Sequence, residues 1–154
     1  MLEQVAGRAG RREGADGTVA IQTYNPAQKV LGFVRRHDYE AFYESEIADR
    51  KSFLYPPFSR IVNIYLRHKN AETLKRLAGA YATRLRALLG SRVYGPEEPA
   101  VGRIQNLYIR KIMLKIETTA SMRKVKDLLR QTHIDLIDQP DMKQILIHFD
   151  VDPF

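Results

Sequence analysis

The sequence predicts an α+β fold in which two helices cover one face of a four-stranded antiparallel sheet, in the order β-α-β-β-α-β. Three stretches carry this prediction. Segment 107–118 alternates strictly between apolar and polar residues, which is the pattern of a half-buried strand. Segments 70–89 and 121–129 instead repeat apolar residues at helical spacing. Because helices alternate with strands in this way, we expect both helices to pack on the same side of one sheet.

The boundaries of these elements follow from proline, glycine and capping residues. Pro56 and Pro57 end any helix and hold the chain extended in front of the first strand. Asn70 is the expected N-cap of the first helix, and Gly90 is expected to end it. Pro140 falls in the turn after the second helix. The four strands are expected at 61–68, 92–94, 107–118 and 144–151.

Two linker helices and one further strand are expected before this domain. Asn25 as N-cap and Pro26 at the first helical position begin the linker segment 26–54. Three aromatic residues share one face of its second helix, namely Tyr39, Phe42 and Tyr43. They could stack on bases, but their helical spacing favours packing. Segment 18–24 is rich in β-branched residues and is expected to form a strand.

Composition restricts the class of protein. The chain has 154 residues, of which 44% are hydrophobic, so it is long and apolar enough to fold. Its net charge of +7 and its isoelectric point near 9.7 favour a polyanionic partner. It contains no cysteine, which excludes disulfides and cysteine-ligated zinc in this stretch. Its apolar runs are too short to span a membrane and no signal peptide is visible, so we expect a cytoplasmic chain.

Near the N-terminus, the string Gln4-x-x-Gly7-Arg8-x-x-Arg11 indicates phosphate chemistry. A planar guanidinium can bind two phosphate oxygens and stays charged at any working pH. A solvated basic turn is the alternative interpretation. The sequence contains neither a G-x-x-x-x-G-K-[ST] loop nor an Asp-Glu pair after a buried strand, so this stretch alone is not expected to hydrolyse ATP.

The same string resembles motif VI of superfamily 2 helicases, and other motifs narrow the resemblance. The further motifs are Gln22-Thr23-Tyr24-Asn25-Pro26, His37-Asp38-Tyr39, Phe42-Tyr43 with Glu46 and Arg50, Tyr55-Pro56-Pro57-Phe58, and Asp150-Val151-Asp152-Pro153. Together with the first string they resemble the primosomal protein N′ family of replication-restart helicases over the whole chain.

This resemblance implies the C-terminal part of an ATP-dependent 3′-to-5′ DNA helicase. Residues 1–25 would be the end of the second RecA-like lobe, residues 26–54 linker helices, and residues 55–154 a C-terminal DNA-binding domain. In such helicases the residues matching Arg8 and Arg11 contact the γ-phosphate of ATP, and the last acts as an arginine finger. The residue matching Gln4 links the nucleotide site to the lobe.

The resemblance also bears on cofactors. It implies ATP and Mg²⁺ in the larger protein, and zinc bound by cysteines upstream of this stretch. Within the chain itself we expect no cofactor. The histidines are His37, His68, His133 and His148, and they have no paired ligand spacing, so a metal site is not expected.

A nucleic-acid site is expected on the sheet face that the helices leave open. Alternation places four residues there: Tyr65, Arg67, Lys111 and Lys115. His148 is a further candidate, and Arg103 and Arg110 are expected at the rim. Cations that follow phosphates beside a ring that stacks on bases suit single-stranded or forked DNA. A merely solvated face is the alternative from the residues alone, and the resemblance favours DNA because the family's C-terminal domain binds it.

A second surface follows from the resemblance alone. In the family, the helix after the third strand contributes to a pocket for the acidic, phenylalanine-terminated tail of single-stranded DNA-binding protein. The basic residues of that helix here are Arg123, Lys124 and Lys126. Solvated lysines and arginines are the alternative. The competing hypothesis for the whole domain is therefore a protein-interaction scaffold whose basic charge serves such a peptide or the neighbouring helicase lobes, with no direct DNA role. The resemblance further implies other primosome proteins as partners.

Overall fold

The computed structural model describes residue 4 and residues 18–137 and 144–153 of the chain. The chain forms two compact units, residues 1–49 and 50–154. Arg8 and Arg11 of the predicted phosphate motif, and the predicted turn at Pro140, lie outside the described residues. Gln4 is described as exposed and helical.

The first unit contains helix α2 (Lys29–Arg36) and most of α3 (Tyr39–Ser52). Two helices are present within the predicted segment 26–54, but the predicted start of the first is wrong: Gln28 is the residue before α2, so Asn25 is not its N-cap and Pro26 is not its first helical residue. Phe33 of α2 meets Phe42 of α3 edge to face, with 6.1 Å between the ring centroids. The prediction of a strand at 18–24 is wrong, because these residues form no regular secondary structure. A β-rich composition makes a strand only where a neighbouring strand can pair with it.

The second unit is the predicted α+β domain. Its strands are β1 (Ser59–His68), β2 (Val93–Glu97), β3 (Arg103–Ile104), β4 (Leu107–Glu117) and β5 (Leu146–Val151). They form an antiparallel sheet in the order β2-β4-β1-β5, and β3 pairs with the beginning of β4. The order of the four longer strands and the two helices is as predicted, and the two-residue β3 is an addition.

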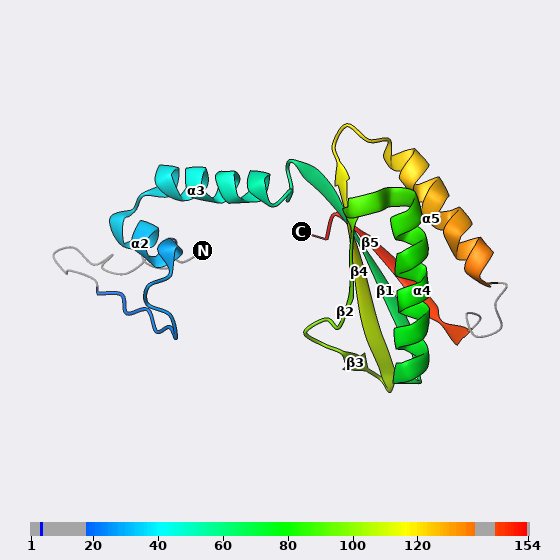
Figure 1. Cartoon of the computed structure of the whole chain (residues 1–154). Helices are drawn as coiled ribbons and strands as arrows, with labels where there is room; N and C mark the ends of the chain where they lie inside the picture. The colour runs from blue at the N-terminus through cyan, green and yellow to red at the C-terminus, as the bar shows by residue number, and fades with distance from the viewer. Residues whose placement is uncertain (1–3, 5–17, 138–143, 154) are drawn as a thin grey trace. The chain divides into compact units, whose positions relative to one another are not determined.

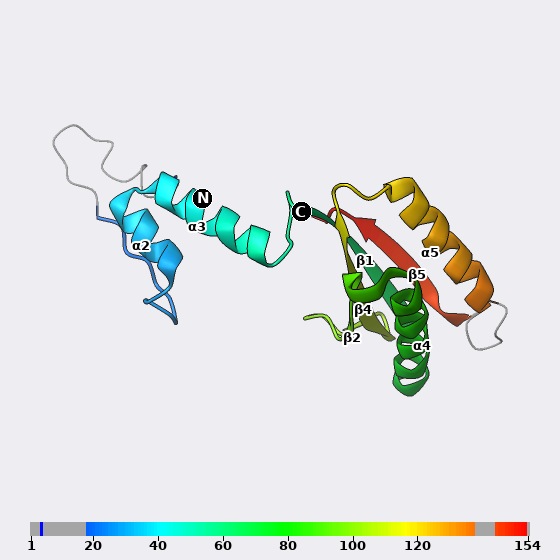
Figure 2. The same ribbon diagram turned by 45° about the horizontal axis from the view of Figure 1, so that its top comes forward.

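Helices α4 (Ala71–Leu89) and α5 (Met122–Ile137) lie on the same side of this sheet (Figures 1 and 2). The Asn70 side chain accepts a hydrogen bond of 2.8 Å from the Thr73 backbone N–H, which confirms the predicted N-cap of α4. Gly90 follows its last residue and begins a short 3₁₀ turn, η1 (Gly90–Arg92).

The core lies between the sheet and the helices. Alternate residues of β1 and β4 face it, and α4 contributes one apolar stripe. All twelve of these core residues are at most 1% exposed: Val62, Ile64, Leu66, Ile112, Leu114, Ile116, Leu74, Leu77, Ala78, Tyr81, Ala82 and Leu85. Val125 and Leu129 of α5 join the same cluster. The period of two in the strands and of 3.6 in the helix therefore placed this core correctly.

Tyr81 is the one tyrosine among the fully buried residues described. Its side chain is 0% exposed, and its hydroxyl has no hydrogen-bond partner within the described parts of the chain. Burial disfavours the phenolate and raises the pKa of Tyr81 from 10.0 to about 12. Between these two pH values the unfolded chain loses the Tyr81 proton and the folded chain keeps it. The contribution of Tyr81 to folding stability should therefore be fully present below pH 10, and it should be lost as the pH rises from 10 toward 12.

Replacing Tyr81 with Phe should remove this alkaline loss. The two pKa values differ by about two units, which corresponds to roughly 2 to 3 kcal/mol of unfolding free energy. At pH 8 the variant should be as stable as the parent or more stable by about 1 kcal/mol, because it buries no unpaired hydroxyl. Urea unfolding at pH 8 and pH 11.5, followed by circular dichroism, measures both effects. Tyr94→Phe is the control, since Tyr94 is 42% exposed. An equal alkaline loss in Tyr81→Phe and the parent would contradict this explanation.

Candidate nucleic-acid interface

The open face is defined as the sheet face opposite the helices. Cross-strand partners share a face, so the register identifies its members. Tyr65 lies opposite Lys111 on β4 and opposite His148 on β5, while Ile61 lies opposite Lys115. Arg67 is two residues beyond Tyr65 and therefore on the same face. All five candidates that alternation assigned to the open face are thus on one surface.

One half of this face is covered by the chain itself. Residues 53–58, named the strap here, connect α3 to β1. Ser59 Oγ donates a hydrogen bond of 2.6 Å to the Leu54 carbonyl of the strap. Ile61 is 0% exposed although α4 and α5 both lie on the other side of the sheet. The strap therefore shields the end of the open face where β1 begins.

Lys115 lies at this covered end and is only 9% exposed. Its Nζ donates a hydrogen bond of 2.7 Å to the Phe53 carbonyl. The same ammonium lies 3.8 Å from the ring centroid of Tyr55 and 5.0 Å from that of Tyr94. Cation–π contacts of this kind are strongest when the cation is shielded from water. Lys115 is therefore committed to the strap and has little surface to offer a phosphate.

The other half of the face is partly exposed and carries the aromatic pair, in which His148 is exposed and Tyr65 is half-buried. The rings of Tyr65 and His148 are stacked, with centroids 6.4 Å apart and planes inclined by 28°. Half-buried Arg67 lies two residues further along β1, and no ion pair joins it to an acid in the described residues. Its Nε is buried and unpaired among those residues. This combination of two rings and a cation can contact a flat, negatively charged ligand.

The remaining predicted cations are partly neutralised. Lys111 forms an ion pair of 2.8 Å with Glu97 on β2. Arg110 lies opposite Leu66, so it projects to the helix side of β4, and it pairs with Glu98 at 3.2 Å. Arg110 is therefore not on the open face. Arg103 donates to Asn106 Oδ1 at 3.1 Å, and its guanidinium lies 4.8 Å from the centroid of the Tyr108 ring.

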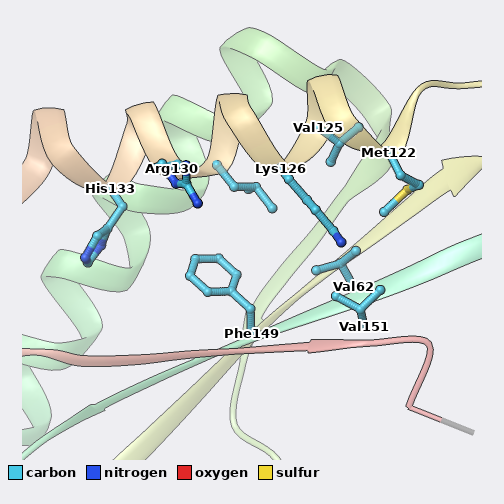
Figure 3. Close-up of a pocket in the computed structure, with 9 residues that line it drawn as sticks. Val62, Met122, Val125, Lys126, Arg130, His133, Phe149 and Val151 are labelled. Carbon is cyan, nitrogen blue, oxygen red and sulfur yellow. The ribbon is translucent and has the colours of Figure 1, made fainter.

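On the opposite side of the sheet, an apolar groove of about 380 Å³ separates α5 from β5 (Figure 3). Val62, Phe149 and Val151 form the sheet side of the groove. Met122, Val125 and Leu129 of α5 also line it. Three basic side chains of α5 complete the lining: Lys126, Arg130 and His133.

Of the three residues predicted to bind a peptide, only Lys126 lines this groove. Arg123 and Lys124 are exposed elsewhere on α5. Sequence reasoning missed Arg130 and His133. Their spacing from Lys126 is four and seven residues, which is the repeat of one helix face, so a helical-wheel comparison could have found them.

Acidic residues near the helices neutralise cations there. Hydrogen bonds from Gln131 and Arg84 lower the pKa of Asp135, and the Arg84–Asp135 distance is 2.9 Å. A hydrogen bond from Arg92 lowers the pKa of Glu117, and Arg92 Nε lies 2.7 Å from Glu117 Oε2. Both pairs are solvent exposed and contribute little to stability, but they show which cations already have an acid beside them.

Neither a metal site nor a membrane-spanning helix is found in the described parts of the chain. The described residues contain no group of three or more histidine, aspartate or glutamate side chains able to hold a metal ion. Nor does any helix in the described ranges have the length and apolar character needed to cross a membrane.

The fold and its surfaces define a basic α+β sheet domain of the split β-α-β type, with helices on one side and a half-covered face on the other. Residues 51–154 match the family model described as the primosomal protein N C-terminal domain, and the chain belongs to this family.

Curated relatives of the chain are named replication restart protein PriA. The chain is 30% identical over 156 residues to the replication restart protein PriA of Bacillus subtilis (strain 168), a match that covers 100% of the chain and 19% of that relative. It is 32% identical over 155 residues to replication restart protein PriA of Treponema pallidum (strain Nichols), covering 99% and 22%. The chain thus spans about a fifth of the length of these relatives.

Replacing Lys115 with Met should release the strap from the sheet. The variant keeps the apolar stem and loses both the Phe53 hydrogen bond and the contacts with the two rings. We expect a loss of about 2 kcal/mol in unfolding free energy. We also expect chymotrypsin to cleave after Phe53 roughly tenfold faster, as the strap opens more often.

Lys111→Met is the matched control, because Lys111 lies on the same strand and face and loses only a partly exposed ion pair. It should cost less than about 1 kcal/mol and leave strap cleavage unchanged. Urea unfolding and mass spectrometry of the cleaved chain give the two measurements. Equal cleavage rates in both variants would show that Lys115 does not hold the strap.

Proposed function

We propose that this chain is the C-terminal part of an ATP-dependent 3′-to-5′ DNA helicase that acts in replication restart and primosome assembly, and that the exposed half of its open face binds single-stranded DNA. Membership of the primosomal protein N C-terminal family supports the first statement. The second depends mainly on one observation, the stacked Tyr65 and His148 rings beside Arg67.

The chemistry of these three residues suits unpaired nucleotides. A base stacked on an aromatic ring contributes roughly 1 to 3 kcal/mol to the binding free energy, and any of the four bases can stack in this way. Arg67 can bind the phosphate next to a base that stacks on Tyr65 or His148, because its guanidinium has no acid partner in the described residues. Lys111 adds a second cation, since its exposed pair with Glu97 is weak enough for a phosphate to displace.

Single strands fit this surface better than an intact duplex does. In a duplex the faces of the bases are covered by neighbouring base pairs, so Tyr65 and His148 would have nothing to stack on. A helix or a β-ribbon usually enters the major groove, whereas this surface is the broad face of a sheet. The net charge of +7 would attract either form of DNA and makes binding dependent on salt.

The role of the phosphate motif belongs to the larger protein. Arg8 and Arg11 would contact the γ-phosphate of ATP held with Mg²⁺ by the preceding part of the helicase, Arg11 as arginine finger, and Gln4 would connect them to the lobe. ATP hydrolysis would drive translocation, and zinc would bind upstream cysteines. In this arrangement the chain supplies transition-state charge stabilisation and a DNA contact.

Replacing Arg67 with Ala, alone and together with Tyr65→Ala, tests the DNA site. The affinity of the chain for a short oligothymidine should fall about tenfold in the double variant, because one ring and one phosphate contact are lost. Arg67→Ala alone should reduce the slope of log affinity against log salt by roughly 0.7. Fluorescence anisotropy at several salt concentrations measures both.

Lys75→Ala removes an exposed cation from α4, on the helix side of the sheet, and serves as the charge control. It should leave the affinity within about twofold, because it changes only the long-range charge. If Lys75→Ala and Arg67→Ala weaken binding equally, the charge is non-specific and the open face is not the site.

The groove between α5 and β5 supports a second function, recognition of an acidic peptide such as the tail of single-stranded DNA-binding protein. Its lining combines an apolar floor with Lys126, Arg130 and His133 on one side. An aromatic or aliphatic side chain can fill the floor while carboxylates meet the cations. The face and the groove lie on opposite sides of the sheet, so the peptide and the DNA need not compete.

Charge reversal along α5 tests this groove. Lys126→Glu with Arg130→Glu should weaken binding of an acidic, phenylalanine-terminated peptide at least tenfold, because the new carboxylates repel it at close range. Arg123→Glu with Lys124→Glu changes the net charge equally but lies outside the groove lining. This control should lose less than about threefold. Calorimetric titration measures both, and equal losses would exclude the groove as the binding site.

A further inference from the structure

The side chains of the open face change in character along the strands. Three successive rows cross the part that the strap leaves uncovered, and each row joins cross-strand partners. Arg67 lies in the outermost row, and the stacked rings of Tyr65 and His148 lie in the next. Asn63 and its β5 partner Asp150 lie in the third row, nearest the strap. A cation, a ring pair and a carboxylate therefore follow one another along the face.

Asp150 carries a charge of the wrong sign for contact with the DNA backbone. It is half-buried, and no ion pair or hydrogen bond of its carboxylate is found among the described residues. A carboxylate repels phosphate, and at neutral pH it can accept hydrogen bonds but cannot donate them. The part of a nucleotide that can lie against Asp150 is therefore an N–H donor on the base.

Asn63 gives independent support for a missing donor at this place. It is 8% exposed, and its Oδ1 is buried without a hydrogen-bond partner within the described parts of the chain. Native proteins leave few buried polar atoms unpaired, because each one lowers stability. The side chains of cross-strand partners begin about 5 Å apart, so Asn63 and Asp150 form one pair of acceptors. A donor that enters between them would satisfy both.

We infer that Asn63 and Asp150 select the base that stacks on the neighbouring rings, and that they favour bases with an exocyclic amino group, such as cytosine, over thymine and uracil. The inference rests on the proposed function of the open face. An amino group carries two N–H donors, which matches two acceptors, and carboxylates accept from the cytosine amino group in known DNA complexes. Thymine and uracil present a carbonyl oxygen in the same position, and the Asp150 carboxylate would repel it.

The order of the three rows agrees with the order of groups in a nucleotide. Residues two apart on one strand are separated by about 6.5 to 7 Å, so Arg67 and Asn63 lie on either side of Tyr65. A nucleotide likewise has its phosphate on one side of the base and its hydrogen-bonding edge on the other. A base stacked on Tyr65 can therefore direct its phosphate to Arg67 and its amino group to Asp150. Lys115 and the strap close the face just beyond Asn63, which leaves room for the edge of one base.

Two probes and two variants test this inference. The probes are oligodeoxycytidine and oligodeoxyuridine of equal length, which differ only at the amino or carbonyl edge of the base. The intact 154-residue chain should bind the cytidine probe about tenfold more tightly, as measured by fluorescence anisotropy. In Asp150→Asn this ratio should fall to about one, because a carboxamide can accept from cytosine and can also donate to uracil. Asp150→Ala should lose the preference as well, without supplying a new amide.

Asp127→Asn is the matched control, since Asp127 is exposed on α5, on the other side of the sheet. It removes the same charge, so it should strengthen the binding of both probes alike and leave their ratio unchanged. Circular dichroism establishes that each variant is folded.

The outcomes separate this inference from the proposed function. If the parent chain binds both probes equally, or if Asp150→Asn and Asp127→Asn keep the same ratio, base selection is overturned. The DNA site itself remains in that case, provided that Arg67→Ala still weakens the binding of both probes. If neither probe binds the parent chain, the proposed function and this inference both fail.

Discussion

The hydrogen bond from Lys115 to the Phe53 carbonyl determines how much of the sheet is available to a partner. Lys115 projects from near the end of β4 to the face opposite α4 and α5, where a bare ammonium would ordinarily meet water. It is instead covered by the strap, with Tyr55 and Tyr94 on its cationic head. Burial of a charge is costly unless its donors are satisfied, and the carbonyl and the two rings satisfy it. One side chain thus joins the strap to the sheet and closes one end of the open face.

Ion pairs further reduce the number of cations that a partner could meet. Glu97 forms an ion pair with Lys111, and Glu98 forms one with Arg110. Asp135 and Glu117 engage Arg84 and Arg92 at the helices. The positive charge that remains beside the stacked rings is therefore much smaller than the net +7 suggests, and it is centred on Arg67 within the described residues. For this reason the identity of the binding residues depends on ion pairing and burial, and the net charge alone would have given the wrong emphasis.

Sequence patterns were sufficient for the core and for the face of each strand residue. The alternation in β4 separates Ile112 and Leu114 from Lys111 and Lys115 without any knowledge of tertiary contacts, because the period of two is a property of the strand alone. Arg130 and His133 were missed although their spacing is local, whereas two other failures concern partners that are distant in sequence. Lys115 and Phe53 are 62 residues apart, and no local pattern indicates their contact. Segment 18–24 has the composition of a strand and forms none, because pairing is also non-local.

Strand β5 contributes to both candidate surfaces, which ties them to one register. Phe149 and Val151 line the groove below α5, while His148, between Phe149 and Ile147, stacks on Tyr65 on the other side of the sheet. A shift of β5 by one residue would exchange these faces and remove the groove floor and the ring pair together. The end of β5 is fixed at Ile61, whose N–H donates to Asp152 Oδ1 at 3.2 Å and whose carbonyl accepts from the Asp152 N–H at 2.8 Å. These two bonds hold the register at the end of the strand where the strap also lies. The covered half of the open face therefore acts as the structural anchor of the register on which both candidate surfaces depend.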